Sequence, residues 1–116
     1  MRIVAIQTDG RKPWRGLVAE SRRERARGLL GRDGLEPGVC MVLRPCRLVH
    51  TFGMRFALDL LFLDARGRIV KVARGVRPGR LGWGGWRART TLEAQTGWLP
   101  KLEPGERVSA AEGFSF

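Results

Sequence analysis

The side chains best suited to acid–base chemistry are one histidine and a carboxylate further along the chain. His50 is the only histidine, and an imidazole titrates near neutral pH. Asp59 stands in an otherwise apolar run, where a carboxylate needs a partner or a raised pKa. At odd spacing on one strand the two face opposite sides, so they converge only if Gly53 bends the strand. The alternative is a histidine in the core and an aspartate that binds the backbone.

Two cysteines add thiol or metal chemistry. Cys40, Cys46 and His50 offer three ligands, whereas structural zinc sites use four, with cysteines in close pairs. Cys46 precedes His50 by four residues, which on one strand separates them by ~13 Å. We expect no metal and no cofactor. A small enzyme or metal site around His50, Cys46 and Asp59 stays as an alternative, although the sequence favours a role other than catalysis.

The segment 65–92 is the best candidate for binding. It holds eight basic residues, no acidic residue, and both Trp83 and Trp86. Arginine neutralises phosphates, and tryptophan stacks on flat ligands. The competing interpretation packs both tryptophans onto the core and leaves the arginines solvated. The candidate ligand-binding residues are His50, Arg55, Asp59, Arg74, Arg77, Trp83, Trp86 and Arg87.

The composition indicates one domain with one core. The chain has 116 residues, of which 43% are hydrophobic, and we expect a single domain over residues 1–116. Its net charge of +11 indicates either an anionic partner or an arginine-rich surface without a specific partner. No apolar run approaches the ~20 residues of a membrane helix, and the first residues do not resemble an export signal. A cytoplasmic location is therefore expected.

The elements that must position these side chains are mostly short strands. Apolar runs bounded by turn residues predict strands at 2–7, 14–19, 39–43, 48–54, 57–63, 68–74, 87–94 and 107–110. The turn signal at 64–67 predicts an antiparallel hairpin of the two strands that flank it. Proline fits the second position of a two-residue hairpin at Arg44-Pro45 poorly, which argues against that hairpin.

Helix signals are few. Ser21 and Glu24 have the spacing of a capping box, which predicts a helix over about 21–31 that ends at Gly31. Gly28 inside that helix indicates a close approach to a sheet. A short helical turn is expected near 96–102. The predicted fold class is mainly β, bordering on α+β: a compact antiparallel sandwich or barrel with one flanking helix.

Several segments together resemble one known family. They are residues 24–32, 50–59, 62–64 with Gly67, 91–94 and 97–98, within a match over about 17–109. In this combination the chain resembles the domain of unknown function family 192. The resemblance implies a sandwich-like or barrel-like β domain with one flanking helix, and it implies no activity.

The function predicted from these features is a small binding or accessory domain without catalysis, with a basic surface that attracts an unknown anionic ligand or partner. A nucleic-acid-binding module that uses the same basic surface is an alternative, although not the favoured one.

Overall fold

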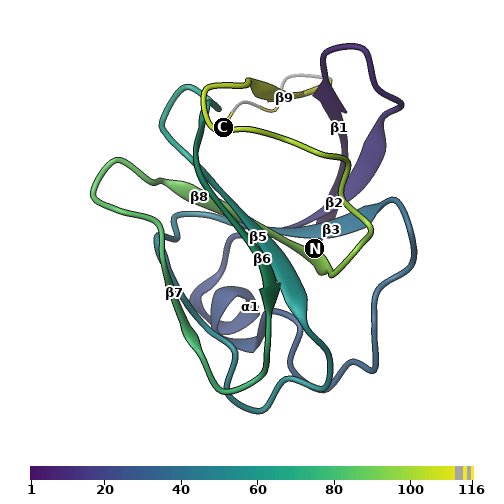
Figure 1. Cartoon of the computed structure of the whole chain (residues 1–116). Helices are drawn as coiled ribbons and strands as arrows, with labels where there is room; N and C mark the ends of the chain where they lie inside the picture. The colour runs from purple at the N-terminus through teal and green to yellow at the C-terminus, as the bar shows by residue number, and fades with distance from the viewer. Residues whose placement is uncertain (112–113, 115) are drawn as a thin grey trace.

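A computed structural model describes residues 1–111, 114 and 116, and its main feature is a strongly curved sheet (Figure 1). The seven-stranded sheet has the order β6-β5-β8-β3-β2-β1-β9, and a separate two-stranded ribbon pairs β4 with β7. The strands are β1 (Arg2–Thr8), β2 (Trp14–Ala19), β3 (Val39–Leu43), β4 (Leu48–His50), β5 (Leu58–Leu63), β6 (Ile69–Val76), β7 (Leu81–Trp83), β8 (Thr90–Gln95) and β9 (Val108–Ala110), and the helix is α1 (Arg22–Arg27). The mainly β fold is confirmed.

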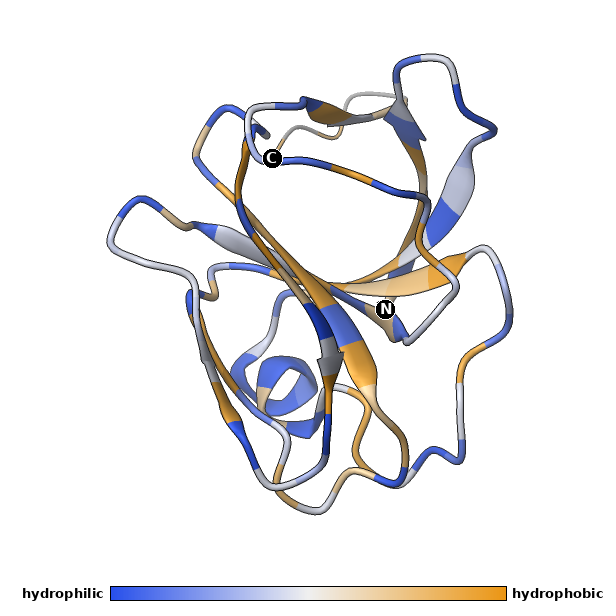
Figure 2. Ribbon diagram, viewed as in Figure 1, coloured by the Kyte–Doolittle hydropathy of each residue, from blue (hydrophilic) through white to orange (hydrophobic). Residues whose placement is uncertain are grey.

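The middle of the sheet is covered on both faces. Every residue of β3 and β5 is buried, as are most of β8, whereas β1 alternates between exposed and buried residues. Figure 2 shows the central strands as the most hydrophobic part of the ribbon. The continuous apolar runs predicted strands here because a strand buried on both faces needs no polar alternation.

The hairpin of β5 and β6 is confirmed. Its strands pair antiparallel, and the amide of Gly67 donates to the carbonyl of Asp64 at 3.1 Å. The Asp64 carboxylate also accepts from the amides of Arg66 and Arg68, at 2.8 and 3.0 Å. A side chain that binds the backbone two residues on stabilises the turn, which is why the aspartate stands at its start.

The antiparallel prediction is wrong for one strand pair. β2 and β3 run parallel, from the partners Arg15 and Val39 to Ala19 and Leu43. Parallel neighbours need a long crossover connection, and the segment 20–38, which includes α1, provides it. β3 and β4 do not form a hairpin, since they belong to different sheets.

The helix is shorter than predicted. Ser21 and Glu24 form the predicted capping box, but the helix ends at Arg27, where Gly28 has a φ of 48° and its amide donates to the carbonyl of Glu24. No helix is present over 96–102 either: Thr96 and Gly97 form a turn. Both donate hydrogen bonds to Asp59, which fixes a turn where the sequence suggested a helical one.

Each face of the sheet carries one hydrophobic cluster. The first contains Ile6, Trp14, Cys40, Leu61, Leu92 and Leu102, and the second contains Leu29, Met41, Val49, Met54, Leu60 and Phe62. Leu102 of the C-terminal segment belongs to the first cluster, whereas Leu29, which follows α1, and Val49 of the ribbon β4–β7 belong to the second. Among the described residues, no helix has the length and apolar character to cross a membrane.

The outermost strands of the sheet approach each other at one end. Arg68, just before β6, forms an isolated antiparallel bridge with Arg107, just before β9. The amide of Ile69 donates to the carbonyl of Glu106 at 2.9 Å, and that of Val108 donates to Gly67 at 2.8 Å. The curved sheet is therefore joined into a half-barrel at this seam.

Candidate functional site

The ribbon β4–β7 is held against the second hydrophobic cluster by its flanking backbone. The amide of Cys46 donates to the carbonyl of Arg89 at 2.9 Å, and the amide of Gly84 donates to the carbonyl of Arg47 at 2.8 Å. A Cβ atom at Gly84 would lie 2.3 Å from Phe62, so a side chain there would push the ribbon off the sheet. Gly82, where a Cβ atom would lie 2.8 Å from Leu60, and Gly84 therefore serve packing, whereas Gly85 has open space around it and a φ of 93°.

A cleft of about 530 Å³ lies between the end of α1 and β4. Its walls are mostly apolar and come from both elements and from β3. The lining residues used below are Arg25, Arg27, Cys46, Arg47, His50 and Glu93, and the apolar lining includes Leu29, Leu30, Leu43, Val49 and Met54. A concave, largely apolar space with a few polar groups is the usual form of a small-molecule site.

Glu93 is the buried polar group of this cleft. It lies in the middle of the sheet, where its register partners are Met41 on β3 and Leu60 on β5, and it is 4% exposed. Its Oε1 atom has no hydrogen-bond partner among the described residues. Burial raises the pKa of this carboxyl from its ordinary value of 4.5 to about 7.

The neighbours of Glu93 along the same face of β8 are both satisfied. The Thr91 hydroxyl donates to the carbonyl of Cys46 at 3.1 Å, and the Gln95 side-chain oxygen accepts from the amide of Leu35 at 2.8 Å. These bonds fasten the two connections on either side of the cleft. Glu93 lies between them without such a bond, so its carboxylate faces the space that those connections leave open.

The thiol of Cys46 lies in the wall of the cleft. It is half-buried, and it donates a weak hydrogen bond to the carbonyl of Leu48 at 3.5 Å. Burial raises the pKa of this thiol, and the charge of Glu93 raises it further. Cys40 lies in the cluster on the other face of the sheet, where burial raises the pKa of its thiol to about 12. The two cysteines therefore do not form one site.

Cations surround the mouth of the cleft. Arg27 is exposed, and Arg25 is half-buried and donates to the backbone carbonyl of Glu20. The Arg47 guanidinium lies over the ring of Trp86, 5.9 Å from its centroid. His50 is exposed, and its ring stacks on a neighbouring phenyl ring. The mouth of the cleft is thus positive, and its floor is acidic.

Asp59 does not line this cleft. It is buried, and its carboxylate accepts four hydrogen bonds. The donors are the Arg74 guanidinium at 3.2 Å, the amide of Gly75 at 2.9 Å, the hydroxyl of Thr96 at 3.2 Å and the amide of Gly97 at 3.1 Å. Asp59 therefore joins β5 to β6 and to the turn after β8. This is the structural role that the sequence left open as the alternative.

The structure separates the other predicted residues into different places. Arg55 pairs with Asp33 at 2.7 Å, and both side chains are largely exposed. Arg74 belongs to the Asp59 cluster, and Arg77 and Arg87 are exposed. No group of three or more histidine, cysteine, aspartate or glutamate side chains in the described part of the chain is placed to hold a metal ion.

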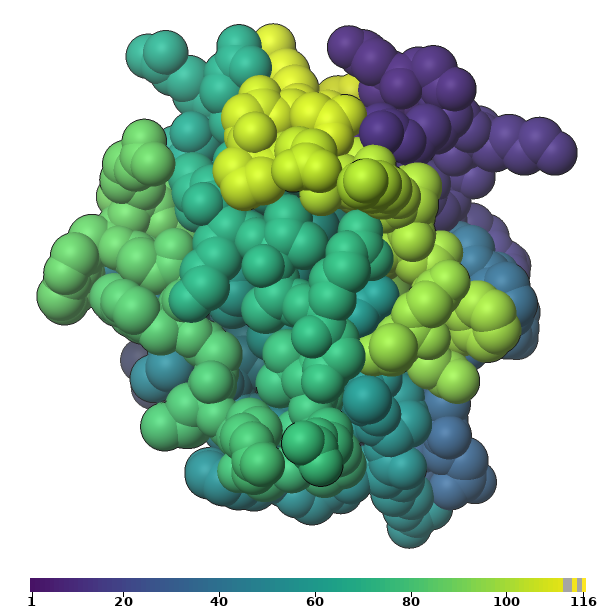
Figure 3. All heavy atoms as spheres, viewed as in Figure 1, coloured from purple at the N-terminus to yellow at the C-terminus, as the bar shows by residue number. Residues whose placement is uncertain are grey.

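Trp83 and Trp86 do not fold back onto the core. Trp86 is 77% exposed and Trp83 39%, and the two rings meet edge to face with centroids 5.1 Å apart. The packed interpretation of the pair is therefore wrong. Figures 1 and 3 show the loop between β7 and β8, in green, projecting from the body of the molecule. The ribbon itself exposes Leu48 opposite Trp83, and Leu81 opposite His50.

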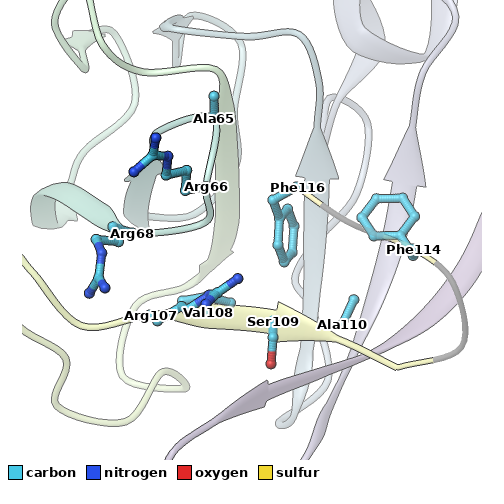
Figure 4. A pocket seen from close by; sticks show the side chains of 9 residues that line it. All are labelled: Ala65, Arg66, Arg68, Arg107, Val108, Ser109, Ala110, Phe114 and Phe116. Carbon is cyan, nitrogen blue, oxygen red and sulfur yellow. The ribbon is translucent and has the colours of Figure 1, made fainter.

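A second cavity, of about 600 Å³, lies at the seam between β6 and β9 (Figure 4). Its lining combines Arg66, Arg68 and Arg107 with the rings of Phe114 and Phe116. Figure 4 shows the side chains of Arg66 and Arg68 extending away from the two phenyl rings. Two of the three cations therefore extend away from the rings, so this cavity is the weaker candidate.

Glu93 was missed in the sequence, although a signal for it was present. The reasoning that singled out Asp59, an acidic residue inside a predicted strand, applies equally to Glu93 in the run Thr91-Leu92-Glu93-Ala94. Its position in the centre of the sheet, with buried strands on both sides, follows only from the strand order. The strand order depends on contacts between residues far apart in the sequence, so a local sequence pattern does not predict it.

Comparison with known protein families matches almost the whole chain to a family. The family model of DUF192, described as "Uncharacterized ACR", matches residues 4–110. No curated protein matches the chain.

Two solved structures have the same fold. A protein of unknown function from Novosphingobium aromaticivorans DSM 12444 is 22% identical with a TM-score of 0.80, and the match covers 92% of this chain and 83% of that one. A "putative transcription regulator" from Sinorhizobium meliloti 1021 is 21% identical with a TM-score of 0.81, covering 94% of this chain and 92% of that one. At this identity the similarity establishes the fold alone.

Proposed function

The chain belongs to the DUF192 family, which has no characterised activity, and we propose from the site itself that it is a binding or accessory domain without catalysis. The proposed ligand carries an anionic group and a flat or apolar group. It would bind over the ribbon β4–β7 and the loop that follows, where Arg47 and Trp86 lie together. In this proposal residues 1–116 form one domain, and its two free cysteines agree with a reducing, cytoplasmic location.

The observation that carries the proposal is the exposed tryptophan pair beside arginines without acidic partners. Of the eight basic residues in segment 65–92, Arg74 is the one whose side chain forms an ion pair within the described residues. Lys71 and Arg89 donate to backbone carbonyls, at 2.7 and 2.9 Å, so these hydrogen bonds do not neutralise their positive charges. Exposed rings next to uncompensated cations favour a ligand that supplies both negative charge and a flat surface.

The cleft chemistry supports a role without a nucleophile. The raised pKa of the Cys46 thiol keeps it protonated and therefore weakly nucleophilic at neutral pH. His50 stacks on Phe52, and Asp59 is occupied by its four donors. None of the three residues considered for a small enzyme is arranged to activate another.

The test is a binding screen that reads tryptophan fluorescence and thermal unfolding together. The ligands are inorganic phosphate, a nucleoside monophosphate and an aromatic carboxylate, at constant ionic strength. We expect quenching and stabilisation by the ligands that combine a ring with an anion, because only they use both Arg47 and Trp86. Trp86→Ala and Arg47→Gln should weaken binding about tenfold.

The matched control is Arg15→Gln, which removes the same charge from β2, where the side chain pairs with Glu36 at 3.2 Å. It should leave binding unchanged. If Arg15→Gln weakens binding as much as Arg47→Gln, the effect is one of net charge and the proposed surface is wrong.

A second candidate is a module for single-stranded nucleic acid on the same surface. The exposed Trp86 ring, with cations on both sides of it in the sequence, is the combination that such modules use to stack bases and neutralise phosphates. The designation of the S. meliloti structure as a "putative transcription regulator" agrees with this alternative. Its signature would be an affinity for oligonucleotides that falls steeply with salt and increases with oligonucleotide length. Binding confined to mononucleotides would exclude it.

A further inference from the structure

We propose that the cleft between α1 and β4 is a second binding site, for a small molecule with an amine at one end, an aliphatic chain and an anionic group at the other end. Its amine would pair with Glu93 at the floor of the cleft, and its anionic group would lie among the arginines at the mouth. This site shares Arg47 with the surface around Trp86, but its floor at Glu93 and its apolar lining lie outside that surface, so neither proposal depends on the other.

The Glu93 carboxylate at the floor of the cleft needs a hydrogen-bond donor. A buried carboxylate without a hydrogen-bond partner costs folding free energy, and proteins normally provide one. Here the two positions that flank Glu93 on the same face, Thr91 and Gln95, are both used to fasten loops. The Oε1 atom of Glu93 has no such use, and a Cβ atom at Gly28 would lie only 3.4 Å from it. Because a glycine ends α1 at that point, the helix end approaches the carboxylate without donating to it.

The walls and the mouth define the rest of the ligand. Leu29, Leu43, Val49 and Met54 give the cleft an apolar lining that suits methylene groups. Arg25, Arg27 and Arg47 line the same space, so a ligand with cations at both ends would be repelled at the mouth. A single ammonium group carried inward, with a carboxylate left outside, satisfies both ends.

The experiment uses three probes of equal chain length: 6-aminohexanoate, hexylamine and hexanoate, titrated into the full chain by calorimetry. We expect 6-aminohexanoate to bind most tightly, hexylamine to bind more weakly, and hexanoate not to bind. Glu93→Gln, which keeps the shape of the side chain, should weaken 6-aminohexanoate at least about tenfold. Glu103→Gln is the control for the loss of one exposed carboxylate and should bind as the unaltered chain does.

A second readout uses the thiols. Cys46 lies in the wall of the cleft, whereas Cys40 is fully buried on the other face of the sheet. Bound 6-aminohexanoate should slow alkylation of Cys46 severalfold, and Cys40 should stay unmodified in the folded chain. Trp86→Ala should leave this protection unchanged, which separates the cleft from the proposed anion-binding surface.

The affinity for the amine should also increase between pH 5 and pH 8, as Glu93 becomes charged. The other charged or titratable groups that face the cleft are Arg25, Arg27, Arg47, Cys46 and His50. Glu93→Gln serves as the reference that isolates the contribution of the carboxylate from that of these groups. A pH dependence of the affinity that survives unchanged in Glu93→Gln belongs to another group and contradicts the assignment.

Three results would each overturn the proposal. The first is hexanoate binding as tightly as 6-aminohexanoate, which would show that no amine is needed. The second is full affinity in Glu93→Gln. The third is the absence of both calorimetric binding and Cys46 protection with all three probes.

Discussion

Two buried carboxylates on neighbouring strands have opposite surroundings. Asp59 on β5 is the register partner of Ala94, and Glu93 on β8 is the register partner of Leu60, so the two carboxylates lie one position apart on opposite faces of the sheet. Asp59 has four donors, whereas Oε1 of Glu93 has none among the described residues. The satisfied carboxylate holds the fold together, and the unsatisfied one marks a place where the protein lacks a partner.

The largest effect is expected at the satisfied carboxylate. Asp59→Ala should lower the free energy of unfolding by about 3 to 5 kcal/mol, because four hydrogen bonds to a charged group are lost together. Solvent reaches some of the released donors, which keeps the cost below the sum of the four bonds. Urea unfolding measures the change. Asp59→Asn retains one acceptor oxygen, so its free energy of unfolding should lie between those of the unaltered chain and Asp59→Ala. A loss of free energy of unfolding below about 1 kcal/mol would show that the hydrogen bonds of Asp59 do not hold the fold together, and the contrast with Glu93 would then fail.

The second effect concerns Glu93 and depends on pH. Its pKa is raised from 4.5 to about 7 by burial, so folding stability is lost as the pH rises from 4.5 through 7. Glu93→Gln removes this loss and should be more stable than the unaltered chain by no more than about 3 kcal/mol at pH 8. At pH 4 the difference should disappear, because the carboxyl is then protonated in both states. Equal stabilities at pH 8 would show that Glu93 is satisfied after all.

A smaller effect is expected from the hydroxyl beside Glu93. Thr91→Val keeps the shape of the side chain but removes the donor to the Cys46 carbonyl, which should cost about 1 kcal/mol. The same change releases one wall of the cleft, so alkylation of Cys46 should become faster. Thr90→Val on the other face is the matched control, and it should leave the reactivity of Cys46 unchanged.

The smallest effect is expected where a carboxylate is exposed. Arg55 and Asp33 form a shorter ion pair than Arg74 and Asp59, at 2.7 against 3.2 Å, but both of its side chains are in solvent. Arg55→Gln should therefore change the stability by less than about 0.5 kcal/mol. A loss comparable to that of Asp59→Ala would show that burial does not decide the difference.

Local patterns predicted the local parts of the fold. The capping box at Ser21 and the hairpin at Asp64–Gly67 depend on residues a few positions apart, and both are confirmed. The parallel pairing of β2 with β3 and the ribbon of β4 with β7 join segments that are distant in sequence, and no short pattern specifies them. The helix ended early because Gly28 adopted a positive φ next to the sheet, a tertiary effect that overrode the apolar spacing at Leu29 and Leu30.

The site was predicted less well for the same reason. Segment 65–92 was identified from its composition, since charge and tryptophan content can be counted without a fold. The cleft could not be identified in this way, because its parts come from α1, β3, β4 and β8. His50 reaches it, whereas Asp59, which the sequence joined to His50, belongs to another cluster.

The seam where Arg68 meets Arg107 limits one route to self-association. An open sheet leaves backbone donors and acceptors at both margins, and these can recruit a strand from another molecule. Here the two margins supply each other with hydrogen bonds at Ile69–Glu106 and Gly67–Val108. The part of β6 beyond the seam carries Lys71 and Arg74, whose charges oppose the docking of a second β6. Because the two edges of the sheet are joined at the seam, fewer unpaired backbone groups remain that could pair with a strand of another molecule.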